Sequence, residues 1–403
     1  MGSSIRHLIP LLLFFYCCSG DEKRAGNVPY SSNPRTNNFL LQGRNALKQH
    51  NFIQALALAD SADKYAIQKA DVHFFKGRVY SELGRFADAE QAYNNALKAM
   101  PNYRGVWNNL GNNAYRQQNF SQAVDYYRKE VAQNQTPTPL RALGRAFVEL
   151  GKTDSARTYF QKAIDLDMNY ATAHFNLAQL EEDEGSLNQA LQHVGRAYGI
   201  EPDNLEYRYV YSTLLVQMNR GDEAIYNLRE IVDKWPWHHG AHYNLGRAFI
   251  QTGQKTDGEY YLERAEHVRA TQAKIDHLEN TVRALPDDPY SYAALAFALR
   301  KVGRYNDAMH SYKVALYLEP NNFDIWNNVA NLYLLQGDTI TALDTYNYIV
   351  KRNPELIDVW LNMGVVYALS NQKEKARSAW QRVLNYQPDN TAALNYLKKL
   401  NNN

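Results

Sequence analysis

The chain contains almost no cysteine, and its charges are nearly balanced. Both of its cysteines, Cys17 and Cys18, stand close to the N-terminus, so the rest of the chain can form no disulfide and offers no thiol for catalysis. Its 44 lysines and arginines are matched by 42 aspartates and glutamates, which argues against a nucleic-acid partner held by phosphate contacts. A hydrophobic content of 45% and a charged content of 21% are ordinary for a soluble globular protein and argue against disorder.

The sequence also lacks the motifs on which common catalytic sites are built. It has no glycine-rich phosphate-binding loop, no nucleophile elbow and no HExxH segment. No acid, base and nucleophile are gathered in one segment, and the repeats described below leave no room for a catalytic domain. We therefore expect neither enzyme activity nor a cofactor.

One hydrophobic run stands out at the N-terminus, from Leu8 to Tyr16. It is too short to span a bilayer, and its length predicts a signal peptide over residues 1–18. The run ends at Cys18, in a pattern that resembles a bacterial lipoprotein signal, whose cysteine is acylated. The alternative is ordinary cleavage after Gly20. Residues 19–35 are mostly polar and predict a flexible tether.

A small residue returns along the rest of the chain at a nearly constant period. It stands at Gly77, Gly111, Gly144, Ala178, Ser212, Gly246, Ala296, Ala330 and Gly364. Successive positions differ by 34 residues, except for one step of 33 and one of 50. An alanine follows twelve residues later in most copies, and a proline often closes the unit, as at Pro101. A fixed period in this range indicates a solenoid of stacked units.

The period has a physical cause, which the unit over residues 70–103 illustrates. Aromatic and small residues at spacings of three and four predict two amphipathic helices. Gly84 lies between them and supplies the backbone freedom that a tight turn needs. Gly77 and Ala89 are small enough to let the two helices approach closely, and Pro101 ends the second helix. Because one hairpin cannot bury its apolar face alone, the units must stack.

These units resemble tetratricopeptide repeats, from about Thr36 to the C-terminus. The resemblance implies an all-α fold, a right-handed superhelical solenoid of about ten helix-turn-helix repeats. The repeats are predicted to begin near Thr36, Ala70, Arg104, Pro137, Ala171, Leu205, His239, Pro289, Phe323 and Ile357. Residues 36–272 would form repeats 1–7, and residues 289–390 would form repeats 8–10. Residues 391–403 would form a C-terminal capping helix, in which Leu394, Leu397 and Leu400 cover the last repeat.

The step of 50 residues leaves 16 surplus residues (50 minus 34) between Gly246 and Ala296. Val268, Ile275 and Leu278 keep helical spacings through this stretch, so we expect the second helix of repeat 7 to continue over residues 273–288. The lengthened helix is either a tolerated insertion or a functional feature, namely a docking surface or a change in the phase of the superhelix.

A candidate binding groove follows from the resemblance, because first helices line the concave surface in this family. Its predicted residues are Arg78, Asn109, Asn112, Arg141, Arg145, Asn176, Asn244, Arg247, Asn328, Asn331 and Asn362. An asparagine amide both donates and accepts, so a ladder of them can pair with the backbone of an extended peptide. Guanidinium groups beside them favour carboxylates. The alternative is that these asparagines are simply solvated.

Part of the groove resembles the carboxylate clamp of chaperone-tail-binding family members. Arg141 and Asn176 stand at two of the clamp positions, with Arg145 at a third, where the clamp more often has asparagine. Glu206 and Val210 occupy places where the clamp needs basic residues. Recognition of a free C-terminal carboxylate by that mechanism is therefore not expected.

Two further clusters have simpler explanations. His238, His239 and His242 could ligate a transition metal, but they span a turn between repeats, with no cysteine beside them. His242 also takes the bulky packing position of its repeat, which is tryptophan in three others, so we expect no metal site. The acidic run at residues 181–184 is expected to be a solvated face.

The function that these observations favour is a non-catalytic protein-interaction scaffold in a bacterial cell envelope. It would be exported to the periplasm or outer membrane and touch the membrane only through a lipid anchor at Cys18. Its partner would be a protein or an extended peptide bound in the concave groove, and no nucleic acid. The alternative is an adaptor of an envelope assembly, pilus or polysaccharide export machine that acts through the lengthened helix.

Overall fold

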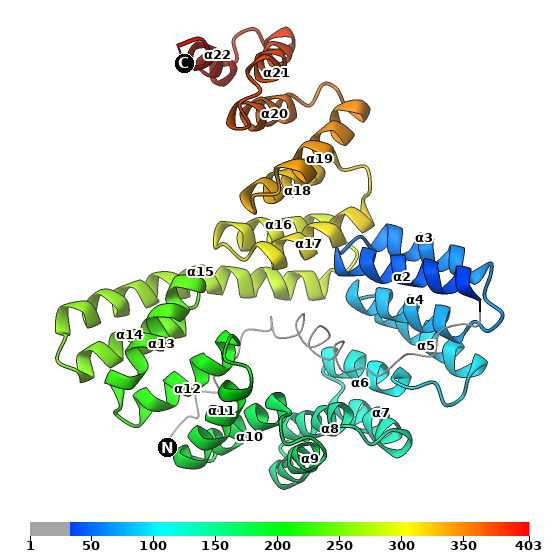
Figure 1. Cartoon of the computed structure of the whole chain (residues 1–403), viewed down its shortest axis with the longest axis vertical. Helices are drawn as coiled ribbons and strands as arrows, with labels where there is room; N and C mark the ends of the chain where they lie inside the picture. Colours follow the sequence, from blue (N-terminus) through cyan, green and yellow to red (C-terminus); the bar gives the residue numbers. More distant parts are fainter. Residues whose placement is uncertain (1–32, 403) are drawn as a thin grey trace. The chain divides into compact units, whose positions relative to one another are not determined.

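The computed structural model describes residues 33–402, and every regular element in this part of the chain is an α-helix (Figure 1). The helices follow one another as antiparallel pairs, and each pair corresponds to one predicted repeat. The described residues form two compact units, one ending at Asp276 and one beginning at His277, which we call unit 1 and unit 2.

Unit 1 contains seven first helices, each paired with a second helix. The first helices are α2 (Pro34–Lys48), α4 (Ala70–Glu82), α6 (Val106–Arg116), α8 (Pro137–Glu149), α10 (Ala171–Asp183), α12 (Leu205–Gln217) and α14 (His239–Gln251). Their partners are α3 (Phe52–Asp63), α5 (Phe86–Ala99), α7 (Phe120–Gln133), α9 (Thr153–Leu166), α11 (Leu187–Ile200), α13 (Gly221–Lys234) and α15 (Lys255–Ala284). Every first helix begins at, or within two residues of, the start that the period predicts.

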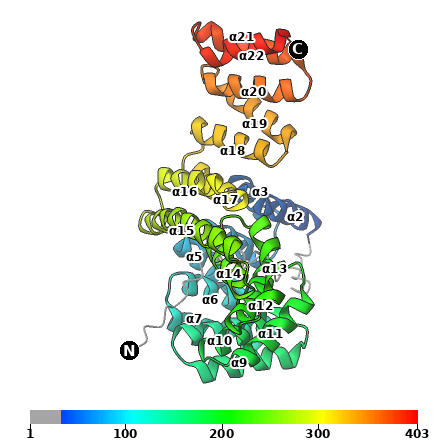
Figure 2. The ribbon, with the colours of Figure 1, turned by 90° about the vertical axis from the view of Figure 1, so that its left-hand side faces the viewer.

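Unit 2 contains three hairpins and a final helix, which Figure 2 shows in order toward the C-terminus. The hairpins are α16 (Pro289–Lys301) with α17 (Tyr305–Leu318), α18 (Phe323–Leu335) with α19 (Thr339–Arg352), and α20 (Ile357–Leu369) with α21 (Lys373–Tyr386). The final helix, α22 (Thr391–Asn402), covers Trp380 of the last hairpin with Ala393, Tyr396 and Leu397. Leu394 does not contribute to this cap as predicted, because 46% of its side chain is exposed.

The surplus residues lie in α15, a continuous helix of 30 residues. It ends at Ala284, four residues before the predicted end, because Pro286 follows and a proline disfavours helical backbone in the residue before it. The boundary between the two units, at Asp276, falls within this helix.

In the hairpins α4–α5 and α8–α9, the small residue marks a close contact between the two helices. A Cβ atom added at Gly77 would lie 2.5 Å from a ring carbon of Tyr93, and one at Gly144 would lie 2.5 Å from a ring carbon of Phe160. Both rings are fully buried. In both hairpins the ring follows the glycine by 16 residues, so the small residue and the ring form one packing unit that recurs with the period.

Candidate functional site

The predicted groove residues divide between the two units. Eight of them lie on α4, α6, α8, α10 and α14 of unit 1, and Asn328, Asn331 and Asn362 lie on α18 and α20 of unit 2. Within unit 1, α8 carries two of these residues, Arg141 and Arg145.

Arg145 is held between α6 and α8 by Tyr115. Its Nη2 atom donates to the Tyr115 hydroxyl at 3.3 Å, and its guanidinium carbon lies 4.9 Å from the centre of the Tyr115 ring. The same hydroxyl donates to Oε1 of Glu149 at 2.7 Å. Burial raises the pKa of Tyr115 to about 12, so the hydroxyl stays protonated and keeps donating. Arg145 is half-buried, and its head is therefore oriented by the fold.

Arg141 is not the exposed groove charge that the resemblance implies. Only 8% of its surface is exposed, and its Nε atom donates to the hydroxyl of Tyr170 at 3.2 Å. Tyr170 is itself buried in the hydrophobic core of repeats 3 and 4. Arg141 therefore belongs to the wall of the solenoid, and reversing its charge would disturb packing as well as any ligand contact.

Five of the predicted groove asparagines stand at the sixth position of their repeats, counted from the predicted repeat starts, and we call them the position-6 asparagines. They make hydrogen bonds within the protein. Asn244 donates through Nδ2 to Thr213 at 3.0 Å on the preceding first helix, and Asn362 donates to Asn331 at 3.1 Å in the same way. The amides of Asn109, Asn176 and Asn328 donate within their own helices. These asparagines are thus not simply solvated side chains. A bound peptide would have to use their oxygens or displace these bonds.

The asparagines at the ninth position of their repeats, Asn112 and Asn331, instead connect the two helices of their hairpins. Asn112 accepts a hydrogen bond from the hydroxyl of Tyr127 at 2.8 Å, and Asn331 accepts one from Tyr346 at 2.5 Å. Tyr127 and Tyr346 are fully buried rings of the second helices. These side chains therefore have a structural role that sequence spacing could not separate from a binding role.

Arginines occupy the same position in other repeats. Arg247 lies with its guanidinium 6.0 Å from the centre of the Tyr243 ring. Arg78 and Arg44 lie close enough to Tyr103 to oppose the rise in its pKa, which burial and a hydrogen bond to Asp71 cause. Position 9 thus carries guanidinium groups on α2, α4, α8 and α14.

Glu206, which the clamp comparison singled out, titrates near neutral pH. Burial of its carboxyl raises the pKa to about 7, and the positive charge of Arg145 opposes this rise. The surface around Arg145 consequently gains negative charge as the pH rises through neutrality.

The histidine segment after α13 is used for helix capping and packing. His238 caps α14, since its Nδ1 atom accepts from the backbone N–H of Ala241 at 3.1 Å. The His242 ring hydrogen-bonds through Nε2 to the carbonyl oxygen of Pro236 at 3.0 Å. The rings of Trp235 and His238 stack 5.8 Å apart. In the described part of the chain, no group of three or more histidine, cysteine, aspartate or glutamate side chains is arranged to hold a metal ion.

The acidic run at residues 181–184 is not wholly a solvated face. Glu181 is only 4% exposed and accepts from Nη1 of Arg157 at 3.3 Å, while Glu184 accepts from Nη2 of the same arginine at 2.5 Å. The prediction was wrong because the spacing within α10 does not show which of four acids faces α9.

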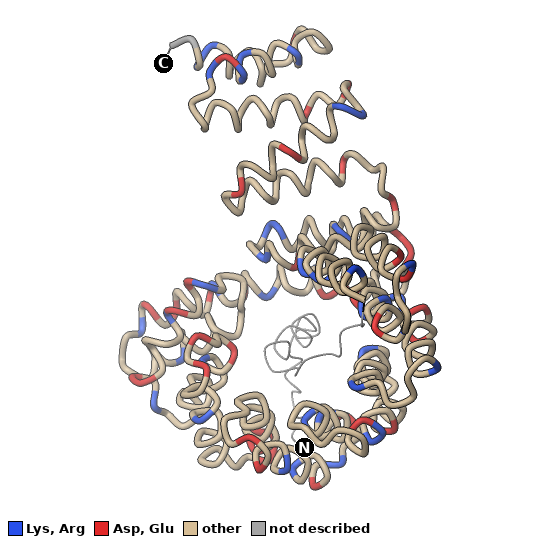
Figure 3. The backbone as a smooth tube through the Cα atoms, turned by 45° about the vertical axis from the view of Figure 1, so that its right-hand side comes forward, with Lys and Arg blue, Asp and Glu red and all other residues tan. Residues whose placement is uncertain are grey.

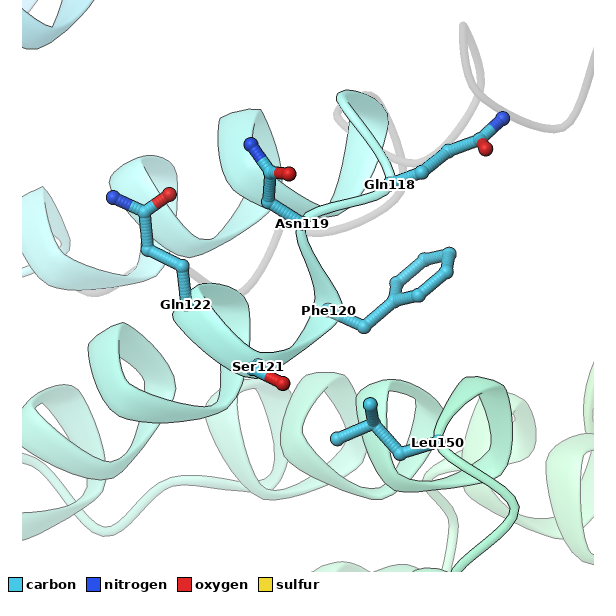
Figure 4. Close-up of a pocket in the computed structure, with 6 residues that line it drawn as sticks. All are labelled: Gln118, Asn119, Phe120, Ser121, Gln122 and Leu150. Atoms are coloured by element: carbon cyan, nitrogen blue, oxygen red, sulfur yellow. The ribbon is translucent and has the colours of Figure 1, made fainter.

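Elsewhere on the described part of the chain, two surface features are relevant to the predicted groove: the distribution of charge and one depression. Acidic and basic residues are interspersed along the backbone (Figure 3). A depression at the turn between α6 and α7 is lined by polar and apolar side chains, among them Gln118, Asn119 and Phe120 (Figure 4). It contains none of the predicted groove residues. None of the described helices has the length and apolar composition needed to cross a membrane.

Family models identify the repeat. Tetratricopeptide repeat models match residues 40–103, 76–137 and 212–273, and further models of the same repeat match residues 144–183, 289–322, 311–344 and 358–390. Together with the helical hairpins, these matches show that the chain belongs to the tetratricopeptide repeat proteins. The fold is that of a scaffold for protein–protein interaction, and such scaffolds are typically non-catalytic.

Several curated proteins share this similarity over part of their length. Human protein O-mannosyl-transferase TMTC1 is 23% identical over 212 residues, which cover 51% of this chain and 22% of the human protein. The TPR repeat-containing protein YpiA of Bacillus subtilis is 19% identical over 301 residues, covering 74% of this chain and 66% of YpiA. The chain thus spans only about a fifth of the length of the human transferase.

Solved structures show the same partial likeness. The pilF protein of Pseudomonas aeruginosa aligns with a TM-score of 0.45 at 19% identity, covering 51% of this chain and 95% of pilF. YrrB, described as a TPR protein with an unusual peptide-binding site, aligns with a TM-score of 0.39 at 19% identity, covering 45% of this chain and 94% of YrrB.

Proposed function

We propose that unit 1 binds an extended, partly acidic segment of a partner protein on its first helices, around Arg145. The observation that carries this proposal is the fixed position of the Arg145 head, which Tyr115 orients by a hydrogen bond and by stacking. A guanidinium held in one orientation can donate two parallel hydrogen bonds to a carboxylate at little further entropic cost.

Two features support an acidic rather than a neutral ligand. Guanidinium groups recur at position 9 on α4 and α14, with Arg78 and Arg247, so a strand running across the first helices meets several cations. Glu206 loses its negative charge below a pH of about 7, since its pKa is raised to about that value. We therefore expect an acidic segment to bind more tightly at pH 6 than at pH 8.

Reversing the charge of Arg145 is expected to weaken this binding by at least about tenfold, because a charge-assisted hydrogen bond is replaced by repulsion. The measurement is fluorescence anisotropy with 12-residue peptides selected from a random displayed library on the purified protein. The matched control is Lys98→Glu, which makes the same change at an exposed position of the second helix α5. Lys98→Glu should melt like the wild type, and the melting temperature of the Arg145 variant shows how far the loss of its contact with Tyr115 also destabilises the fold. Peptides without an excess of Asp and Glu, or equal losses in the two variants, would contradict the proposal.

We infer that the protein works in a bacterial envelope, tethered by a lipid on Cys18. Support comes only from the apolar run Leu8 to Tyr16 and the cysteine that follows it, which lie outside the described residues. Cys18→Ser should move the protein from the membrane fraction to the soluble fraction after export, and should abolish labelling with a radioactive fatty acid. A wild-type protein that is already soluble and begins at Asp21 would disprove the lipid anchor.

The alternative is an adaptor that docks through α15. This helix carries the aromatic side chain of Tyr260, which is 62% exposed. A photo-reactive amino acid placed at Tyr260 and, separately, at Asn109, whose amide bonds only at the start of its own helix, would distinguish the two surfaces in intact cells. We expect partner cross-links from Asn109 and none from Tyr260.

A further inference from the structure

One repeat of unit 1 brings two histidine rings together. His174 lies on α10 and His193 on α11, and their Nδ1 atoms are 3.2 Å apart. The two residues are 19 positions apart in the sequence and belong to different helices, so no short motif relates them. Neither ring is part of the groove around Arg145.

The repeat itself determines which nitrogen of His174 carries hydrogen. His174 holds the fourth position of its repeat, where Trp326 and Trp360 donate through Nε1 to a carbonyl oxygen six residues earlier, both at 2.8 Å. A carbonyl oxygen can only accept, so a ring nitrogen that bonds to it must donate. His174 makes the same contact, from Nε2 to the carbonyl oxygen of Met168 at 3.1 Å. In the neutral ring, Nδ1 therefore carries no hydrogen, and its lone pair is directed at His193.

His193 also contacts an oxygen with its second nitrogen. Its Nε2 atom lies 3.7 Å from Oε1 of Glu181, a carboxylate that is only 4% exposed. If the Nδ1–H of a neutral His193 donates to Nδ1 of His174, then Nε2 of His193 carries no hydrogen. Nε2 and the carboxylate oxygen of Glu181 are then two acceptors that face each other. A cation between the Nδ1 atoms removes the conflict, because both Nε2 atoms can then carry hydrogen.

We propose that His174 and His193 bind one divalent transition-metal ion, of the zinc, nickel or copper(II) class, through their Nδ1 atoms. Two nitrogens at about 2.0–2.1 Å from a tetrahedral zinc ion are about 3.3–3.4 Å apart, close to the separation found here. The Nε2 atom of His174 then donates to a backbone carbonyl oxygen, and that of His193 lies 3.7 Å from a carboxylate oxygen, which resembles the usual arrangement around metal-bound histidines.

The surroundings are compatible with such an ion. The nearest cations are engaged elsewhere: Arg157 pairs with Glu181 and Glu184, and Arg196 donates to Asn169 at 3.3 Å. The His193 side chain is 27% exposed, so water can supply the remaining ligands. Only two protein ligands are present, and the affinity should accordingly be modest.

The test is calorimetric titration of the purified full chain with zinc chloride at pH 7.5, repeated with nickel chloride. We expect one ion per chain. His174→Trp should abolish binding while preserving the fold, because it installs the residue that fills this place in α18 and α20 and keeps the bond to the carbonyl. His193→Gln should also abolish it. Glu181→Gln should weaken binding by about 10–100-fold without changing the stoichiometry.

The controls use histidines outside the pair. His267→Gln changes an exposed histidine of α15, and His238→Asn changes the histidine segment after α13, so both should leave binding unchanged. Circular dichroism and melting temperatures of all variants would separate a lost ligand from a lost fold. The proposal is overturned if no saturable binding occurs, if His174→Trp and His193→Gln still bind one ion, or if His267→Gln reduces binding as much as they do, which would indicate an adventitious ion only.

Discussion

Replacing Gly144 with alanine is expected to lower the free energy of unfolding by about 2–3 kcal/mol. The added Cβ atom would lie 2.5 Å and 2.7 Å from two ring carbons of Phe160, well inside van der Waals contact. Phe160 is 1% exposed and lies in the core shared by repeats 3 and 4, so its ring cannot move without displacing its neighbours. The hairpin of α8 and α9 would have to open slightly to relieve the clash.

The matched control is Gly199→Ala, the same change on a different helix. Gly199 lies in α11, and a Cβ atom added there meets nothing within 4 Å. This variant should be more stable than the wild type by about 0.5–1 kcal/mol, because alanine has the higher helix propensity. Unfolding in urea followed by circular dichroism measures both. If the two variants shift the midpoint in the same direction, the close helix contact at Gly144 is not what makes glycine necessary.

Acidification from pH 7.5 to pH 5 is expected to cost about 2 kcal/mol of stability through His238 alone. Burial, with smaller contributions from the positive charges of His239 and His242, lowers the pKa of His238 from 6.5 to about 4. The unfolded chain therefore takes up a proton on this ring near pH 6.5, while the folded chain takes it up only near pH 4. The stabilisation is complete above pH 6.5 and is lost as the pH falls toward 4. Protonation also breaks the bond from Ala241 to Nδ1 that caps α14.

The decisive variant is His238→Asn. Asparagine is a good N-cap and does not titrate, so it keeps the acceptor and removes the pH dependence. The difference between the urea midpoints at pH 7.5 and pH 5 should be smaller in this variant than in the wild type. His267→Gln, at an exposed position, should leave the wild-type difference unchanged. Identical pH dependence in wild type and His238→Asn would show that His238 is not the group responsible.

The groove illustrates where sequence patterns stop being informative. Asn109, Asn244 and Asn362 were predicted from their shared repeat position, which is a sound guide to the face of the helix. Whether an amide on that face bonds to a ligand or to the next helix depends on the distance to the neighbouring repeat. Asn244 reaches Thr213 because the two first helices are packed side by side, and the period alone contains no such distance.

Distances between neighbouring helices also explain why the sequence led to a wrong prediction for some residues and to no prediction for others. The run at residues 181–184 has the composition of a solvated surface, yet Glu181 faces Arg157 of α9 and His193 of α11. His174 could have been suspected from its place among the tryptophans at position 4 of other repeats. Its pairing with His193 could not have been predicted, because it depends on how α11 is rotated about its own axis and so on which of its residues face α10.

The sequence by itself determined the all-helical repeat fold, the number of hairpins and the start of each first helix to within two residues. It did so because small residues, turn glycines and terminal prolines recur every 34 positions, and each acts over a single hairpin. The tertiary structure alone decided that Arg145 is oriented, that Arg141 is buried and that two imidazoles meet at 3.2 Å. These features depend on side-chain distances between helices, which arise only when the hairpins pack against one another.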